Sequence, residues 1–255
     1  LNVDTILVNE YLGLTLTGVY VISFFFGTII LVPAVALGKI SSTFIAEAWK
    51  NKDMKMISDI YFKSSINQLF AALLLYILMV ANLHNIISIL GQEYEGGEWV
   101  IILIALSKLI VSSTGSSVQI IGTSHKFKVQ TYSMAVLVLL SVIFYLIFIP
   151  LYGITGAALG SLFSISIAAL LRVFYLKQSM NLFPYRLVHL KCVAIGLVAF
   201  AVGKFIPFLN NNFIDLIIRS SAVSVVFIGL CYLFHITEDM NQIVHKVFKR
   251  IKIIR

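Results

Sequence analysis

Long apolar segments alternate with short polar connections along the chain. About 20 apolar residues in an α-helix span the hydrocarbon core of a bilayer. By that measure the sequence predicts seven full transmembrane helices after a shorter first segment: Thr17–Ala46, Ile66–Leu83, Trp99–Ile121, Val129–Ile149, Ile154–Leu176, Leu187–Ile206 and Phe213–Phe234. We therefore expect an all-α integral membrane protein that folds as a polytopic helical bundle.

The first segment, Leu1–Tyr11, has the pattern of the end of a helix whose beginning lies upstream, and the chain starts with leucine rather than methionine. We interpret the sequence as the C-terminal part of a longer protein, with a membrane region in residues 1–236 and a tail in residues 237–255. In the tail, apolar residues recur at three- and four-residue spacing with basic residues between them. That pattern predicts a basic amphipathic helix on the cytoplasmic leaflet, either a topology anchor or a docking helix for a partner.

Composition supports the membrane assignment. Hydrophobic residues make up 60% of the chain, charged residues make up 12%, and the mean hydropathy is +0.99. A soluble domain carries about 25% charged residues, so one water-soluble core cannot hold all of these apolar side chains. Cys192 and Cys231 lie in apolar runs and are interpreted as small buried hydrophobic residues. Neither has a second metal ligand at a suitable spacing, and we expect no metal or other cofactor.

The basic residues are concentrated in every second connection. Fifteen of the 19 lysines and arginines lie in four segments: Glu47–Lys63, Gly122–Lys128, Arg172–Lys191 and the tail. None lies in the three alternate connections: Asn82–Glu98, Pro150–Gly153 and Pro207–Asn212. Successive crossings produce this alternation, and the positive-inside rule places the basic segments and the C-terminus in the cytoplasm. The net charge of +8 is thus explained without nucleic acid, and the connections are too short for a catalytic domain.

Four basic residues lie within the predicted helices, where a charge is costly. Lys204 and Arg219 lie within about two turns of non-cytoplasmic helix ends, and we expect both side chains to extend to the membrane surface. Lys39 lies about two turns from a cytoplasmic end and follows Pro33. It either extends to the surface in the same way or lines a cavity opened where the proline breaks the helix. Lys108 lies near the midpoint of its helix, beyond easy reach of either surface.

Two segments carry small residues that are typical of close helix packing. One is Ser112–Ser117, and the other contains Gly156 and Gly160 at GxxxG spacing. Packing explains the small residues of both segments. Packing does not explain Lys108, which lies on the same predicted helix as Ser112–Ser117.

Lys108 therefore needs a partner. It is expected either to face a water-filled cavity lined by cations or to form a buried ion pair. Asp4 is the only acid that the sequence places deep in the membrane. It is a candidate ion-pair partner for Lys108 or Lys39, and a candidate acid for coupling to an ion or a proton.

Several short stretches, taken in order, resemble a known family. They are Asp4-Thr-Ile-Leu-Val, Tyr11-Leu-Gly, Gly18-Val-Tyr20, Gly91 with Tyr94 and Gly97, Gly122-Thr-Ser-His-Lys126, and Pro150-Leu-Tyr-Gly-Ile-Thr-Gly-Ala-Ala158. Together they resemble the second half of polysaccharide-export (O-antigen type) flippases, within the multidrug/oligosaccharidyl-lipid/polysaccharide exporter superfamily. The resemblance runs from Leu1 to about Leu176, and beyond that only hydropathy and topology agree.

The resemblance implies one lobe of a two-lobed alternating-access transporter with a central, typically cationic cavity. Such a protein is not an enzyme. It turns undecaprenyl-pyrophosphate-linked oligosaccharide from the cytoplasmic to the outer face of the bacterial plasma membrane. Its implied partners are this substrate, membrane lipid and the N-terminal lobe. Lys108 and Lys39 would bind the substrate, because a pyrophosphate crosses hydrocarbon only when fixed positive charge replaces its hydration.

Other functions remain open. A drug or cation exporter of the same superfamily should have acids and aromatic residues in its cavity rather than lysines, and a flippase for peptidoglycan precursors needs the same charges as the sugar flippase. A membrane-embedded oligosaccharide polymerase is a further alternative, with Glu93 and Glu95 as a carboxylate pair. The last is a non-transporting scaffold subunit, which a dry bundle with an internally paired Lys108 would favour.

Overall fold

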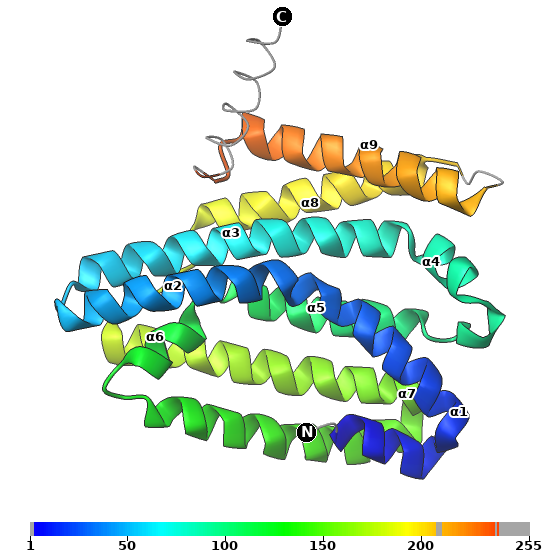
Figure 1. The fold of residues 1–255 in the computed structure, drawn as a ribbon, viewed down its shortest axis with the longest axis horizontal. Coiled ribbons are helices and arrows are strands. Elements are labelled where there is room, and N and C mark those ends of the chain that lie inside the picture. The colour runs from blue at the N-terminus through cyan, green and yellow to red at the C-terminus, as the bar shows by residue number, and fades with distance from the viewer. Residues whose placement is uncertain (1–2, 208–210, 238, 240–255) are drawn as a thin grey trace, which may run out of the picture.

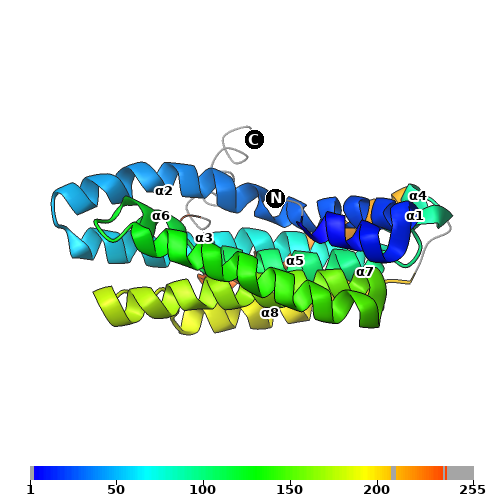
Figure 2. The ribbon, with the colours of Figure 1, turned by 90° about the horizontal axis from the view of Figure 1, so that it is seen from below.

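The computed structural model describes residues 3–207, 211–237 and 239. All regular elements in these residues are helices: α1 (Val3–Thr28), the 3₁₀ helix η1 (Ile29–Leu31), α2 (Val32–Lys50), α3 (Met54–Ala81), α4 (Leu83–Leu90), the 3₁₀ helix η2 (Gln92–Tyr94), α5 (Glu98–Ser113), α6 (Ser117–Thr123), α7 (Lys128–Met180), α8 (Leu187–Phe205) and α9 (Asn212–Leu233). Figures 1 and 2 show most of the long helices running along a common direction in an elongated bundle. The all-α fold class is confirmed.

Five helical segments are long and apolar enough to cross a membrane: Val3–Lys50, Met54–Ala81, Lys128–Met180, Leu187–Phe205 and Asn212–Leu233. The bent pair of α5 and α6 makes a sixth if the two helices form one span. A helical membrane protein is thus confirmed. These lengths alone do not establish the predicted count of seven full crossings, because two of the segments are broken by a glycine.

The first break divides α1 at Gly13, whose φ of 80° and ψ of 175° are not helical. Glycine tolerates this conformation because it has no Cβ. The chain doubles back there, since the hydroxyl of Tyr20 donates a hydrogen bond to Asp4 at 2.9 Å, across 16 residues of sequence. The short helix before Gly13 agrees with the predicted helix end in Leu1–Tyr11.

The second break divides α7 at Gly153, with φ of 58° and ψ of −137°. The two parts pack side by side, and a Cβ on Gly156 would lie 1.9 Å from the carbonyl oxygen of Phe148. A Cβ on Gly160 would lie 2.6 Å from the ring of Tyr145. The predicted close helix contact at Gly156 and Gly160 is confirmed, and it forms within one hairpin.

The prediction of one unbroken helix over Trp99–Ile121 is wrong. α5 and α6 are separate helices bent by 54°. At the bend, Gly115 has a φ of 56°, and a Cβ there would lie 2.7 Å from the backbone nitrogen of Ser65 on α3. The N–H of Ser116 donates to the Ser64 hydroxyl at 3.0 Å, which satisfies a backbone donor that the bend releases. The small residues predicted to pack closely here do so against α3.

The basic connections gather at one end of the bundle. Figure 1 shows the α2–α3 and α6–α7 connections and the end of α7 at that end, and α4 and the turn within α7 at the other. Two predicted connections are corrected in detail. Asn82–Glu98 contains α4 and η2, and α7 continues to Met180, so that the connection before α8 begins after Met180 rather than at Arg172.

α3 is central to the packing. Its residues Leu69, Leu73 and Ile77 contact α8 and α9 in one apolar cluster, which also includes Cys192 and Cys231. Both cysteines are fully buried, as predicted. Of the predicted tail helix at residues 237–255, the structure describes only residues 237 and 239, so the tail helix lies outside the described residues.

Arg219 does not extend to the membrane surface, and that prediction is wrong. The residue is 1% exposed, and its side chain forms two hydrogen-bonded contacts with Asp215, at 3.1 Å from Nε and 3.0 Å from Nη2. It also donates to the carbonyl oxygen of Gly203 on α8, while Asn85 of α4 donates to Asp215. Asp215 is therefore a fully buried acid, whereas Asp4 is only half-buried, and this cluster joins α9 to α8 and α4. Lys204, in contrast, is exposed.

Candidate functional site

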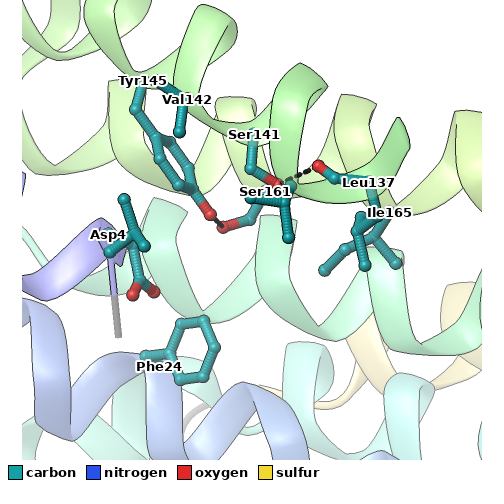
Figure 3. Close-up of a pocket in the computed structure, with 10 residues that line it drawn as sticks. Asp4, Phe24, Leu137, Ser141, Val142, Tyr145, Ser161 and Ile165 are labelled. Carbon is teal, nitrogen blue, oxygen red and sulfur yellow. Dashed lines mark hydrogen bonds between the residues drawn. The ribbon is translucent and has the colours of Figure 1, made fainter. Parts of the chain in front are cut away.

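A cavity of about 210 Å³ lies between the two parts of α1 and the two parts of α7. Most of its wall is apolar, and the polar groups come from four residues: Asp4, Ser141, Tyr145 and Ser161. Figure 3 shows Asp4 and Phe24 from α1 on one side and the α7 residues on the other. The glycine breaks create this arrangement, because each returns the chain past itself and brings residues 16 positions apart into contact.

Asp4 is held in place by a buried hydroxyl. Tyr20 is fully buried, and its hydroxyl donates to Oδ2 of Asp4 at 2.9 Å. Across the cavity, the hydroxyls of Tyr145 and Ser161 lie 2.9 Å apart and bond to each other. The carboxylate of Asp4 acts electrostatically on both tyrosines. One acid and two phenols thus form a polar cluster in apolar surroundings, where their interactions are stronger than in water.

Lys108 approaches the same place from α5. Its side chain is half-buried, and Nζ lies 5.3 Å from the centroid of the Phe24 ring, a cation–π distance. Phe24 also lines the cavity. Asp4 acts electrostatically on Lys108, although among the described residues no direct ion pair joins them. Asp4 and Lys108, the two groups singled out as possible partners, therefore lie close together around one aromatic ring.

Lys39 is placed apart from this pair. It is exposed on α2, next to Gly38, whose missing side chain admits the Gln119 amide of α6: a Cβ would lie 2.6 Å from Nε2. Within the described residues no contact joins Lys39 to Lys108 or Asp4. The structure brings together two of the three predicted site residues, and the role of Lys39 stays a prediction.

A second polar cluster lies at the bend between α5 and α6, and the sequence showed it only in part, as the serine run. The backbone N–H of Arg186 donates to Nδ1 of His189 at 3.1 Å. Nε2 therefore carries the ring proton and donates to the hydroxyl of Ser65 at 2.9 Å, and Ser65 donates to the carbonyl oxygen of Ser113 at 2.6 Å. This neutral tautomer of His189 links α8, α3 and the end of α5 in one chain of hydrogen bonds.

Tyr185, in the connection before α8, completes this cluster. Its hydroxyl lies 3.2 Å from the hydroxyl of Ser113, and its ring packs edge-on against His189 at 5.3 Å. Burial raises the pKa of Tyr185, and the bond to Ser113 offsets part of the rise. The phenol therefore stays protonated as a hydrogen-bond partner at the bend.

In the part of the chain that the structure describes, no group of three or more His, Cys, Asp or Glu side chains is arranged to hold a metal ion. Comparisons with models of protein families, with curated proteins and with solved structures found no match to this chain. What the site does must therefore be argued from its residues: an acid, a lysine and aromatic rings inside a helical membrane protein.

Proposed function

We propose that the chain is one lobe of a flippase that moves a lipid-linked oligosaccharide from the cytoplasmic to the outer leaflet of the bacterial plasma membrane. The observation that carries the proposal is the position of Lys108, a half-buried cation between membrane helices beside Asp4 and Phe24. An internal lysine in a membrane helix is costly unless it has a function or a partner. An anionic diphosphate ester linked to a lipid is a substrate that gives it one.

The proposed topology has seven full crossings. They are the part of α1 after Gly13 together with α2, then α3, α5 with α6, the two parts of α7, α8 and α9. This count agrees with the gathering of the basic connections at one end of the bundle, which the positive-inside rule assigns to the cytoplasm. The C-terminus then lies in the cytoplasm, and Lys39 faces the cavity shared with the N-terminal lobe.

The pairing of Lys108 with Asp4 suggests how the substrate is bound and released. Before substrate arrives, the carboxylate offsets the charge of Lys108. A diphosphate takes over as the counter-ion, and Asp4 is then neutralised by a proton or a cation, because an unpaired buried carboxylate is costly. Loss of that proton or cation on the outer side restores the pairing of Asp4 with Lys108 and weakens the binding of the diphosphate. Rocking of one lobe against the other alternates the access.

The test uses the full-length gene. The gene is deleted, and lipid-linked oligosaccharide on the inner leaflet is measured after complementation with wild type, Lys108→Ala or the exposed control Lys204→Ala. We expect the intermediate to accumulate in the deletion strain and with Lys108→Ala, and not with Lys204→Ala. If the deletion causes no accumulation, the flippase assignment is wrong. If the deletion causes accumulation but Lys108→Ala does not, the role of the lysine is wrong.

The lining of the cavity supports a second candidate, an exporter of organic cations. Asp4, Phe24 and Tyr145 line the cavity, whereas Lys108 contacts the Phe24 ring and is not among the lining residues. Acids and aromatic rings attract cations. This candidate predicts that deletion sensitises cells to cationic dyes and that Asp4→Asn, rather than Lys108→Ala, abolishes their efflux. The flippase predicts unchanged dye efflux in both variants.

A further inference from the structure

Arg172 is a buried cation that the proposed transport site does not use. It lies in the second part of α7, eight residues before Met180, which corresponds to about 12 Å from the helix end at a rise of 1.5 Å per residue. Only 7% of the residue is exposed. Its neighbours are Tyr61 on α3 and Ser133 in the first part of α7. The C-terminal end of α7 lies at the end of the bundle where the basic connections gather (Figure 1).

The hydrogen bonds made by Arg172 leave the guanidinium incompletely satisfied. Nη1 donates to the hydroxyl of Ser133 at 3.1 Å. Nε is buried and has no partner. The one group that acts electrostatically on Arg172 among the described residues is the hydroxyl of Tyr61, and no carboxylate does so.

Two neighbouring polar side chains also lack partners. Tyr61 is fully buried on α3, and its hydroxyl makes no hydrogen bond. Gln130 lies one turn before Ser133 on α7, and neither its amide nitrogen nor its amide oxygen is paired. Buried polar groups in proteins are nearly always hydrogen-bonded, to protein, water or ligand. The Nε of Arg172, the hydroxyl of Tyr61 and the side-chain amide of Gln130 therefore all lack hydrogen-bond partners.

The positive charge and the free hydrogen-bond donors of this cluster favour binding of an anion. The guanidinium cannot lose its proton in a protein, so burial without a counter-ion is strongly unfavourable. The remaining donors are the N–H groups of Arg172, the hydroxyls of Tyr61 and Ser133 and the amide nitrogen of Gln130. A planar guanidinium with converging hydroxyl and amide donors is the arrangement that binds phosphate oxygens.

We propose that Arg172, Tyr61, Gln130 and Ser133 form a binding site for one phosphate group. The phosphate belongs either to an anionic phospholipid of the leaflet at the basic end or to a free phosphate ion. Lys126 in the connection before α7 and Lys128 at the start of α7 lie at the same end and add to the local positive potential. This site does not depend on the proposed transport function, since it shares no residue with the cavity at Asp4 or with Lys108.

The test compares ligand binding by the full-length protein and by Arg172→Gln, with Lys177→Gln as the matched control for loss of a basic side chain. Lys177 lies near Arg172 on the same part of α7 but is exposed and stacks on Phe183 at 4.8 Å. Delipidated protein in a neutral detergent is titrated with phosphatidylglycerol, with phosphatidylcholine or with inorganic phosphate. Retained lipid is measured by native mass spectrometry and the thermal unfolding midpoint by tryptophan fluorescence.

We expect wild type and Lys177→Gln to bind phosphatidylglycerol or inorganic phosphate, and Arg172→Gln to bind at least about tenfold more weakly, as follows from loss of one charge-assisted hydrogen bond. A response to phosphatidylglycerol alone identifies a lipid headgroup, and a response to inorganic phosphate identifies the free ion. If Arg172→Gln does not yield folded protein, Tyr61→Phe, which removes one donor, is expected to weaken binding in the same direction. Equal binding by wild type and the folded variant, or no binding by wild type, overturns the proposal.

Discussion

The buried pair of Arg219 and Asp215 provides a sharp test of the packing of the last two helices. Asp215→Asn keeps the shape of the side chain and the contact with Asn85 but removes the negative charge. Arg219 then loses the carboxylate that faces it, in a site where the arginine is 1% exposed and the acid fully buried. The perturbation therefore leaves a buried positive charge without its counter-ion.

The expected cost follows from that geometry. Two hydrogen-bonded contacts at 3.0 and 3.1 Å join the side chains, and removing one partner of a buried ion pair destabilises a protein by about 3–5 kcal/mol. Bilayers reduce such values, because the unfolded helices in lipid also find partners, so we expect the lower end, about 3 kcal/mol. The matching double variant Asp215→Leu with Arg219→Met removes both charges and should cost clearly less than Asp215→Asn alone.

Unfolding of the purified full-length protein in mixed micelles by increasing mole fractions of a denaturing detergent measures these differences directly. The exposed residue Lys204 offers a control, since Lys204→Met is expected to change stability by less than about 0.5 kcal/mol. A destabilisation of Asp215→Asn that is no larger than that of the control would refute the reasoning. So would a double variant less stable than Asp215→Asn, because it would show that the charges are not coupled.

Two further predictions concern the glycine hairpin and the hydrogen bonds at the helix bend. Gly156→Val should separate the two parts of α7, since even a Cβ would lie 1.9 Å from a carbonyl oxygen; we expect aggregated protein in size-exclusion chromatography, whereas Gly122→Ala, where a Cβ meets nothing within 4 Å, should elute normally. His189→Phe should cost about 1–3 kcal/mol in detergent unfolding, because the Arg186 N–H loses its acceptor. Tyr185→Phe loses one weaker contact of 3.2 Å and should cost less. Equal losses for these two variants would contradict the larger contribution assigned to the hydrogen bonds of His189.

The membrane helices could be predicted from the sequence because the bilayer imposes a length. A segment inside the hydrocarbon core has no water to bond, so it must satisfy its own backbone hydrogen bonds, as a helix does. About 20 apolar residues in a helix span that core. The alternation of basic and non-basic connections could likewise be read from the positions of the lysines and arginines along the chain. The glycines at 13 and 153 end helices by their own conformational freedom, and the predicted boundaries fall near both.

Beyond the contacts of small residues at Gly156, Gly160 and Ser112–Ser117, the packed faces of those helices could not be predicted, and the reason is physical. The interior of a membrane protein and the lipid around it are similarly apolar, so hydropathy does not distinguish a side chain that contacts another helix from one that contacts lipid. Arg219 and Arg172 therefore looked like charges at the membrane surface, yet both are buried. The bend at Gly115 also depends on a distant element, since it forms where α3 approaches.

The sequence by itself determined that the chain is a helical membrane protein, that its charge is segregated among the connections, and that Lys108 faces either a cavity or an acid. Only the tertiary structure decided that Asp4 lies near Lys108 rather than Lys39, and that Arg172 has no carboxylate acting on it among the described residues. Asp4 is far from Lys108 along the chain, and the reversal at Gly13 and the contact of α1 with α5 bring their charges together. Such proximity depends on how helices pack across the bundle, and no local pattern of residues encodes it.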